Sequence, residues 1–156
     1  MKDSERFMRK AAELSIKNID NGGGPFAAII VKDGEIVAEA ANSVTNDLDP
    51  TAHAEVNAIR KAAKKLKNFD LSDCEIYTSC EPCPMCLGAI YWSGIKKVYY
   101  GNTKQDAANI QFSDQFIYQE LERPIENRKV AFIPLLREET LKAFRKWEEK
   151  EDKIAY

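Results

Sequence analysis

The 156-residue sequence lacks a strong charge of either sign. Its 23 basic residues stand against 25 acidic ones, which leaves a net charge of −2. Proteins that bind nucleic acids usually carry a basic stripe. The densest basic stretch here, residues 60–67, is typical of the solvated face of a helix. We therefore do not expect a nucleic-acid partner.

Long apolar runs are missing as well. The longest purely apolar run covers residues 26–31, whereas a membrane-spanning helix needs about 20 residues. Residues 1–6 lead into no apolar core of a signal peptide. We expect a cytoplasmic protein without membrane contact. The length predicts a single domain over residues 1–156, with a core that needs no disulfides.

Cysteine and histidine are scarce, and their positions suggest a metal site. All four cysteines lie between Cys74 and Cys86, which in a reducing compartment indicates a metal before disulfides. The only histidine is His53. One imidazole and two thiolates, from Cys83 and Cys86, are ligands that zinc prefers, and three protein ligands leave a fourth position for water. We expect one Zn²⁺ per subunit with a water or hydroxide as its fourth ligand.

The spacing of these residues fits two helix starts. Cys83 and Cys86 are three residues apart and Pro84 suits the first helical position, so both sulfurs can point from one helical N-terminus. That terminus favours negative charge and helps the thiols to bind as thiolates. His53 follows residues 49–51, which we interpret as a cap and helix start. Two helix starts can thus converge on one metal ion.

Residues two apart on a helix point in different directions, so Glu55 and His53 cannot both bind the same metal ion. We therefore expect the Glu55 side chain to lie beside the metal and not to ligate it. Zinc lowers the pKa of its water toward ~7. A neighbouring carboxyl can take that water's proton and pass it to a leaving amine. One alternative is a closed structural site, in which Cys80 joins His53, Cys83 and Cys86 and no water binds.

Apolar periodicity and turn formers predict alternating helices and strands. We expect a helix capped by Ser4, a hairpin of strands 26–31 and 35–41 turning at Asp33-Gly34, and a loop over 42–51. Further elements are a helix after Thr51, a strand at 74–79, a helix to about 92, strands at 97–100 and 130–135, and helices at 113–121 and 138–149. The last helix should bury Leu141, Phe144 and Trp147. This order predicts an α/β fold, a three-layer α/β/α sandwich around a five-stranded mixed sheet.

The residues around the expected zinc site carry a family resemblance. His53-Ala54-Glu55 and the string at 78–89, TSCEPCPMCLGA, resemble the cytidine-deaminase-like superfamily of zinc deaminases. The resemblance implies the same fold. It also implies that His53, Cys83 and Cys86 bind zinc and that Glu55 is the catalytic proton shuttle.

Beyond these motifs, nearly the whole chain is similar to small bacterial guanine deaminases of that superfamily. The most specific stretches are residues 106–108 and 114–118, and the chain ends in an aromatic residue, as that family's does. A tRNA adenosine deaminase would be expected to have a basic C-terminal helix, whereas residues 148–152 are mostly acidic. The resemblance implies a hydrolase that converts guanine to xanthine and ammonia, with a small purine base as its partner.

The same resemblance implies which residues contact the substrate: Phe26, Asn42, Ala54, Trp92, Asp114 and Tyr156. Asn42 would hydrogen-bond the base, and Phe26 and Trp92 would form aromatic walls. Asp114 would read the amino edge of guanine and assist proton transfer. Tyr156 would act as a lid, within a C-terminal segment of about 137–156 that two subunits of a homodimer exchange.

Four of these residues also have a plain structural interpretation. Asn42 can be a turn former, Asp114 a helix N-terminal acid, and Phe26 and Trp92 core aromatics. The substrate could also be guanosine, adenosine in tRNA, or cytosine. A non-catalytic zinc module is a further alternative, which predicts four protein ligands and no role for Glu55.

Overall fold

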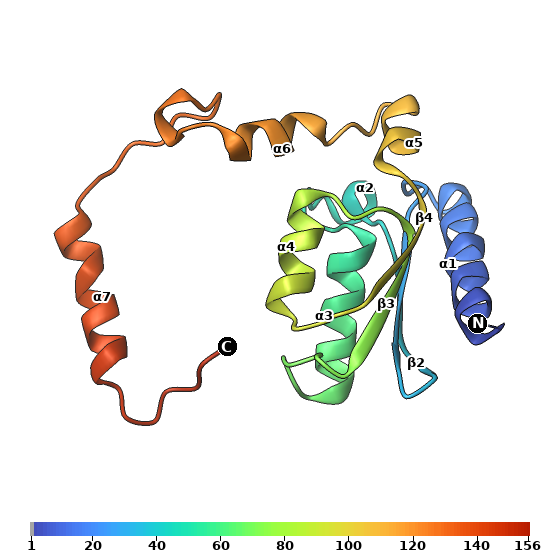
Figure 1. Ribbon diagram of the computed structural model, residues 1–156, viewed down its shortest axis with the longest axis horizontal. Helices are drawn as coiled ribbons and strands as arrows, with labels where there is room; N and C mark the ends of the chain where they lie inside the picture. Colours follow the sequence, from blue (N-terminus) through green and yellow to red (C-terminus); the bar gives the residue numbers. More distant parts are fainter. Residues whose placement is uncertain (1) are drawn as a thin grey trace. The chain divides into compact units, whose positions relative to one another are not determined.

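The structure, a computed structural model, describes residues 2–156. The chain divides into two compact units, Met1–Asp114 and Gln115–Tyr156. The first unit holds α1 (Lys2–Asp20), β1 (Ala27–Lys32), β2 (Glu35–Ala41), α2 (Val44–Asp47), α3 (Ala54–Leu66), β3 (Cys74–Cys80), α4 (Pro84–Trp92), β4 (Val98–Asn102) and α5 (Lys104–Asn109). The second holds α6 (Gln115–Glu122), a short 3₁₀ helix (Ile125–Asn127) and α7 (Arg137–Glu149). Figure 1 gives these labels.

A four-stranded mixed sheet forms the centre of the first unit, with strand order β2-β1-β3-β4. Strand β1 pairs antiparallel with β2 and β3, while β4 pairs parallel with β3. The hairpin turn at Asp33 and Gly34 has φ angles of 50° and 78°, as the Asp-Gly pair predicts. A strand, a helix and a strand in series predict parallel pairing, and β3 and β4 pair in this way through α4. The apolar run becomes the central strand β1, which is buried from Ala27 to Val31.

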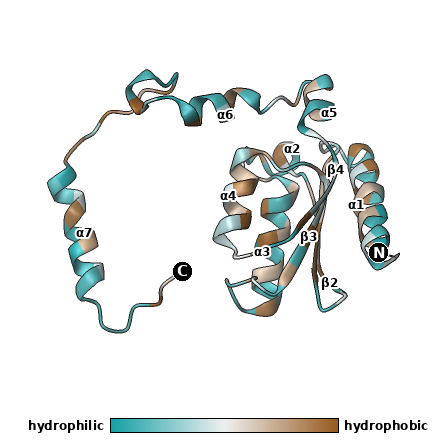
Figure 2. Ribbon diagram, viewed as in Figure 1, coloured by the Kyte–Doolittle hydropathy of each residue, from teal (hydrophilic) through white to brown (hydrophobic). Residues whose placement is uncertain are grey.

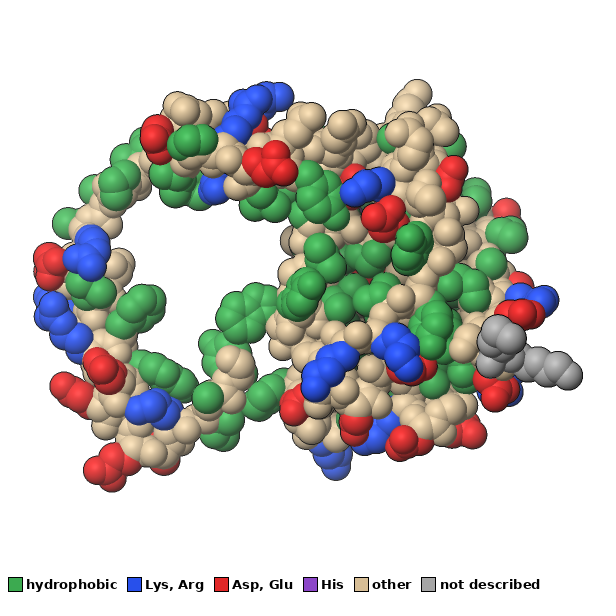
Figure 3. Space-filling view, in the orientation of Figure 1, with side chains coloured by type: hydrophobic (Ala, Val, Ile, Leu, Met, Phe, Trp, Pro, Cys, Tyr) green, Lys and Arg blue, Asp and Glu red, His purple; other side chains and the backbone are tan. Residues whose placement is uncertain are grey.

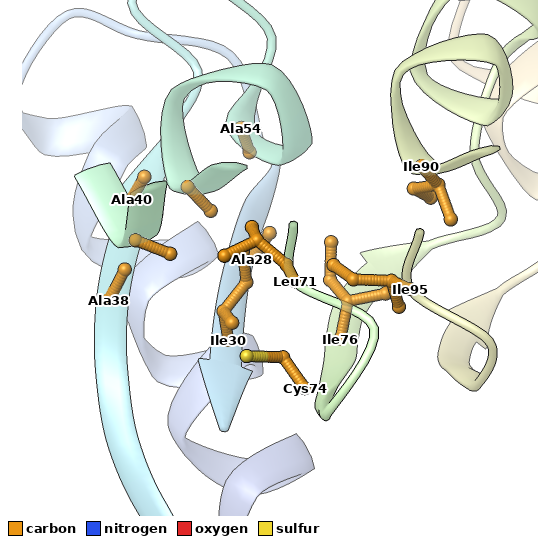
Figure 4. Close-up of a cluster of buried hydrophobic side chains, with 12 residues drawn as sticks. Ala28, Ile30, Ala38, Ala40, Ala54, Leu71, Cys74, Ile76, Ile90 and Ile95 are labelled. Atoms are coloured by element: carbon orange, nitrogen blue, oxygen red, sulfur yellow. The ribbon is translucent and has the colours of Figure 1, made fainter. Parts of the chain in front are cut away.

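Helices cover both faces of this sheet (Figure 1). Side chains alternate along β1, so Ile29 and Val31 lie with Phe7 and Ala11 of α1 on one face. On the other face, Ala28 and Ile30 pack in a cluster with residues of α3 and α4 (Figure 4). Much of that cluster is alanine, which lets α3 approach the sheet closely. The core thus holds α3 and α4 on the same face of the sheet.

Two details of α1 differ from the sequence prediction. The helix already begins at Lys2, so Ser4 lies inside it and its hydroxyl accepts a hydrogen bond from the Tyr77 hydroxyl at 3.2 Å. The apolar residues of this segment predict a broad buried face that includes Ile16 and Ile19, yet both are exposed. The buried face of α1 runs through Phe7, Ala11 and Asn18, and at helical spacing Ile16 and Ile19 lie off this face.

The prediction of a fifth strand at 130–135 was wrong, since residues 131–136 have no regular structure and the sheet has four strands. The described second unit contains no strand that could supply a hydrogen-bonding partner, and a strand is not stable without one. The prediction that α7 buries Leu141, Phe144 and Trp147 was also wrong. No residue of α7 is buried, and Phe144 is 74% exposed. Figure 2 shows the apolar residues along α7, and Figure 3 shows hydrophobic side chains at the surface of the second unit.

Among the described residues, no helix combines the length and the apolarity that crossing a bilayer requires.

Candidate active site

Two helix N-termini carry the residues that the sequence predicts as zinc ligands. His53 is the N-cap of α3 and Cys83 is the N-cap of α4, with Pro84 at the first helical position. Neither N-cap side chain makes a capping hydrogen bond, so the imidazole and the sulfur are available for another partner. The predicted convergence of two helix starts is therefore confirmed.

The start of α3 lies later than predicted. Residues 49–51 form a turn in which Asp49 Oδ1 accepts hydrogen bonds from Thr51 N at 2.8 Å and Thr51 Oγ1 at 2.7 Å. A local side-chain bond of this kind competes with helix formation. The turn delivers His53 to the helix start instead of beginning the helix itself. The expected loop before it, residues 42–51, also contains the short helix α2.

His53, Cys83 and Cys86 form a group that could hold a metal ion, with their ligand atoms all within 4.8 Å of one another. His53 Nδ1 lies 3.5 Å from each of the two sulfurs. Tetrahedral zinc with ordinary bond lengths separates a nitrogen ligand from a sulfur ligand by about 3.6 Å. The donor types and their separations therefore fit zinc with three protein ligands.

The protonation state of Cys83 also suits a metal. Hydrogen bonds from Cys86, which has the larger effect, and from His53 lower the pKa of Cys83 to about 4. Its bond to Cys83, together with burial, raises the pKa of Cys86. The pKa of His53 is raised, mainly by its bond to Cys83. Thiolates are the form that binds metals, and the site already favours a thiolate at Cys83.

Glu55 lies beside this group and is only 7% exposed. Its Oε1 accepts a hydrogen bond from Thr78 Oγ1 at 2.9 Å, and its Oε2 lies 3.3 Å from the Cys86 sulfur. Burial raises the pKa of this carboxyl above its usual range. A raised carboxyl pKa, closer to neutral pH, suits a group that both accepts and donates a proton. Thr78 thus holds one oxygen of the carboxyl while the other faces the metal ligands.

Cys80 does not belong to the ligand group that the described residues form. It is 5% exposed, and its sulfur lies 3.7 Å from the carbonyl oxygen of Thr103. Burial raises the pKa of Cys80 to about 11. The closed four-ligand site is therefore not supported.

Phe26 and Asn42 lie together where β1 begins and β2 ends. The Asn42 backbone N–H donates to the Phe26 carbonyl at 3.0 Å. The side-chain Oδ1 of Asn42 accepts the N–H of Val44 at 3.2 Å, which leaves the amide nitrogen as a donor for another group. Phe26 is half-buried and meets the ring of Phe112 edge-on, with centroids 5.0 Å apart.

Asp114 and Ala54, two further predicted substrate contacts, also belong to the first unit. Asp114 is half-buried, and its pKa is raised, first by burial and then by the negative charge of Cys83. The Ala54 side chain is fully buried in the core, so only its backbone can contact a ligand. Its N–H lies in the first turn of α3, where backbone donors have no intrahelical partner.

The other two predicted contacts are exposed. Trp92 ends α4, about 12 Å along the helix from Pro84, and is 76% exposed. Tyr156 is 84% exposed and belongs to the second unit. Their roles in the site stay predictions.

Sequence reasoning missed three supporting residues: Thr78, Asn57 and Phe112. Thr78 opens the 78–89 motif, so its position was a signal. The Asn57 amide donates to Ala41 O at 3.0 Å, Ser43 Oγ at 2.9 Å and Ala52 O at 3.3 Å, and thus ties the end of β2 to the start of α3. Its place one turn after His53 was its only signal, and Phe112 gave none beyond its nearness to Asp114.

Comparisons with known proteins agree with this geometry. The family model for the cytidine and deoxycytidylate deaminase zinc-binding region matches residues 1–102. A guanine deaminase from Bacillus subtilis (strain 168) is 50% identical over 153 residues, covering 97% of this chain and 98% of that protein. A tRNA-specific adenosine deaminase from Aquifex aeolicus (strain VF5) is 44% identical over 96 residues, or 62% of this chain and 64% of that protein. The X-ray structure of guanine deaminase from Bacillus subtilis matches 97% of this chain and 98% of its own with a TM-score of 0.94.

Proposed function

We propose, because the chain belongs to the cytidine and deoxycytidylate deaminase family, that it is a zinc-dependent hydrolase that converts guanine and water to xanthine and ammonia. The observation that carries this is the buried Glu55 carboxyl beside a His53, Cys83 and Cys86 group placed for zinc. The substrate follows from the guanine deaminase that is similar over nearly the whole chain.

The chemistry requires a water to attack C2 of guanine and the exocyclic amino group to leave. Zinc, when held by His53, Cys83 and Cys86, supplies the activation of that water. Glu55 takes the proton from the water through Oε2, the oxygen nearest the ligand group, and delivers it to the departing amine. Thr78 keeps the carboxyl in this orientation by its bond to Oε1.

The remaining groups would orient the base. The free Asn42 amide donor bonds an acceptor on guanine, while Phe26 and Trp92 stack on its faces. Asp114 accepts hydrogen bonds from the amino edge and assists proton transfer. A site that satisfies these edges rejects bases lacking the matching groups. The half-buried position of Phe26 beside Asn42 supports this assignment.

We also propose a homodimer in which two subunits exchange residues 137–156. The fold would be a three-layer α/β/α sandwich, and the protein would be cytoplasmic. Support for the exchange comes from α7, on which no residue is buried although Phe144 and Trp147 are large and apolar. An apolar helix face of this kind needs a cover. Tyr156 would then close the site of its own subunit or of the partner. Coverage of both faces of the sheet by helices supports the three layers.

The decisive experiment follows guanine conversion by ultraviolet absorbance with zinc-loaded protein. Glu55→Gln is the matched control, because the amide keeps the size of the side chain and can still accept the Thr78 hydrogen bond. We expect turnover in the native protein and its loss in the variant, with zinc content unchanged. Turnover of guanosine or tRNA but not of guanine would show that the substrate is wrongly assigned. Activity of Glu55→Gln equal to that of the native protein would refute the role of Glu55 as proton shuttle.

A further inference from the structure

Asn18 is a buried polar residue of α1 that the proposed chemistry does not use. It lies in the last turn of the helix and is 7% exposed. Its side-chain nitrogen donates to two carbonyl oxygens, that of Gly24 at 2.7 Å and that of Asn42 at 2.8 Å. Both donor hydrogens of the amide are therefore in use. The two carbonyls belong to separate segments, one leading into β1 and one following β2.

A close backbone approach at Gly23 shows how tightly this contact is built. A Cβ on Gly23 would lie 2.3 Å from the Asn18 amide nitrogen and 2.7 Å from the Asn42 carbonyl oxygen. No side chain fits there without displacing one of them. The Gly23 N–H also donates to the Asn18 carbonyl at 2.9 Å, so Asn18 binds the loop with both its side chain and its backbone.

The segments that Asn18 joins are those that carry Phe26 and Asn42. The Asn42 backbone is fixed on one side by Asn18 and on the other by its bond to the Phe26 carbonyl. Its side-chain oxygen is fixed by Val44. Together these bonds leave the Asn42 amide nitrogen with a defined direction. A displaced Asn42 carbonyl would turn that nitrogen away from its present direction.

We propose that Asn18 is a positioning residue for recognition of the base, acting through the Asn42 backbone and the loop that ends at Phe26. This rests on the proposed function, since Asn42 and Phe26 must contact guanine. Asn18 touches neither the zinc ligands nor Glu55 in any described contact. Its loss should therefore weaken the binding of substrate more than the chemical step.

The first test is steady-state kinetics of Asn18→Ala. We expect the KM for guanine to rise about tenfold, the worth of roughly one net hydrogen bond to a buried group, with kcat changed less than about threefold. Zinc content should stay at the native level. Gly23→Ala should reproduce the KM increase, because it disturbs the same contact from the opposite side, and it decides the question if Asn18→Ala fails to fold.

The matched control is Phe7→Leu, on the same helix about three turns away. Phe7 is 2% exposed and packs against Tyr77, so this variant loosens α1 without removing an Asn18 bond. We expect a lower Tm and an unchanged KM. A KM increase in Phe7→Leu equal to that in Asn18→Ala, at similar loss of Tm, would overturn the proposal in favour of general destabilisation.

A double-mutant cycle with Asn42→Ala separates this inference from the function on which it rests. If Asn18 acts through Asn42, Asn18→Ala should raise KM by a smaller factor in the Asn42→Ala background than alone. Equal factors would overturn the positioning role while leaving Asn42 as a base contact. A native KM in both Asn42→Ala and Phe26→Ala would instead refute the assigned substrate contacts, and the role of Asn18 with them.

Discussion

Replacement of Thr78 by valine tests whether the buried hydroxyl holds the catalytic carboxyl. Thr78 is 1% exposed on the central part of the sheet, and its hydroxyl lies 2.9 Å from Glu55 Oε1 and 3.0 Å from the Cys80 carbonyl. Valine has nearly the same shape, so the variant removes the donor and leaves no cavity. Glu55 then keeps its place in the core but loses the bond that orients it.

The size of the effect follows from the kind of bond that is lost. A hydrogen bond to a charged group contributes about 1.5–3 kcal/mol, and each 1.36 kcal/mol of barrier is tenfold in rate. If most of that contribution is used in the transition state, kcat of Thr78→Val should fall about 10- to 100-fold. KM should stay within about twofold, because the described hydrogen bonds of the Thr78 hydroxyl reach Glu55 and Cys80 and none of the proposed substrate residues.

The assay is ultraviolet-monitored guanine turnover, with zinc measured on the same samples. Thr78→Ser is the control, since it keeps the hydroxyl and removes only a methyl group, and its kcat should stay within about threefold of the native value. Native kcat in Thr78→Val would refute the orienting role of the hydroxyl. Equal losses of zinc and kcat in the valine and serine variants would show that the site depends on packing and not on the bond to Glu55.

Three further results are expected. Cys80→Ser should keep zinc and most turnover because its sulfur faces Thr103, whereas Cys83→Ser should lose zinc on metal analysis; zinc loss in both variants would restore the closed site. Burial raises the pKa of Tyr77 to about 12, so the unfolded state, with a tyrosine pKa of about 10, releases its proton first and the free energy of unfolding should fall from pH ~10 to ~12. Urea unfolding at several alkaline pH values should show a shallower fall in Tyr77→Phe, and an identical slope would contradict this reasoning. Removal of the last residues, including Tyr156, should reduce turnover while zinc content stays native, and unchanged turnover would exclude a lid.

The sequence predicted the chemical centre well because zinc chemistry restricts both residue types and spacing. His53, Cys83 and Cys86 are few enough, and regular enough in their spacing, to be recognised without coordinates. Pro84 marked the start of α4, and the Asp-Gly pair marked the hairpin turn. Local signals of this kind act within a few residues, so they do not depend on how the rest of the chain folds.

The supporting residues could not be predicted, because their roles depend on partners far away in the sequence. Asn18 bonds the carbonyl of Asn42, and Thr78 bonds the carboxyl of Glu55, across separate elements of the fold. Nothing in the neighbourhood of Asn18 distinguishes it from an ordinary polar side chain, and the place of Thr78 at the start of the 78–89 motif does not reveal its partner. Only the packing of α1 and α3 on opposite faces of the sheet brings these pairs together.

The failed predictions have the same origin. Apolar residues at 130–135 have strand character, yet a strand also requires a partner to complete its hydrogen bonds, and the described second unit offers none. The apolar side of α7 likewise remains exposed without a surface to pack on. The sequence by itself determined the ligand set, the acid beside it and the local turns, because these follow from short-range chemistry. Tertiary structure alone decided which polar groups orient that chemistry and which apolar segments are buried, because both depend on long-range contacts.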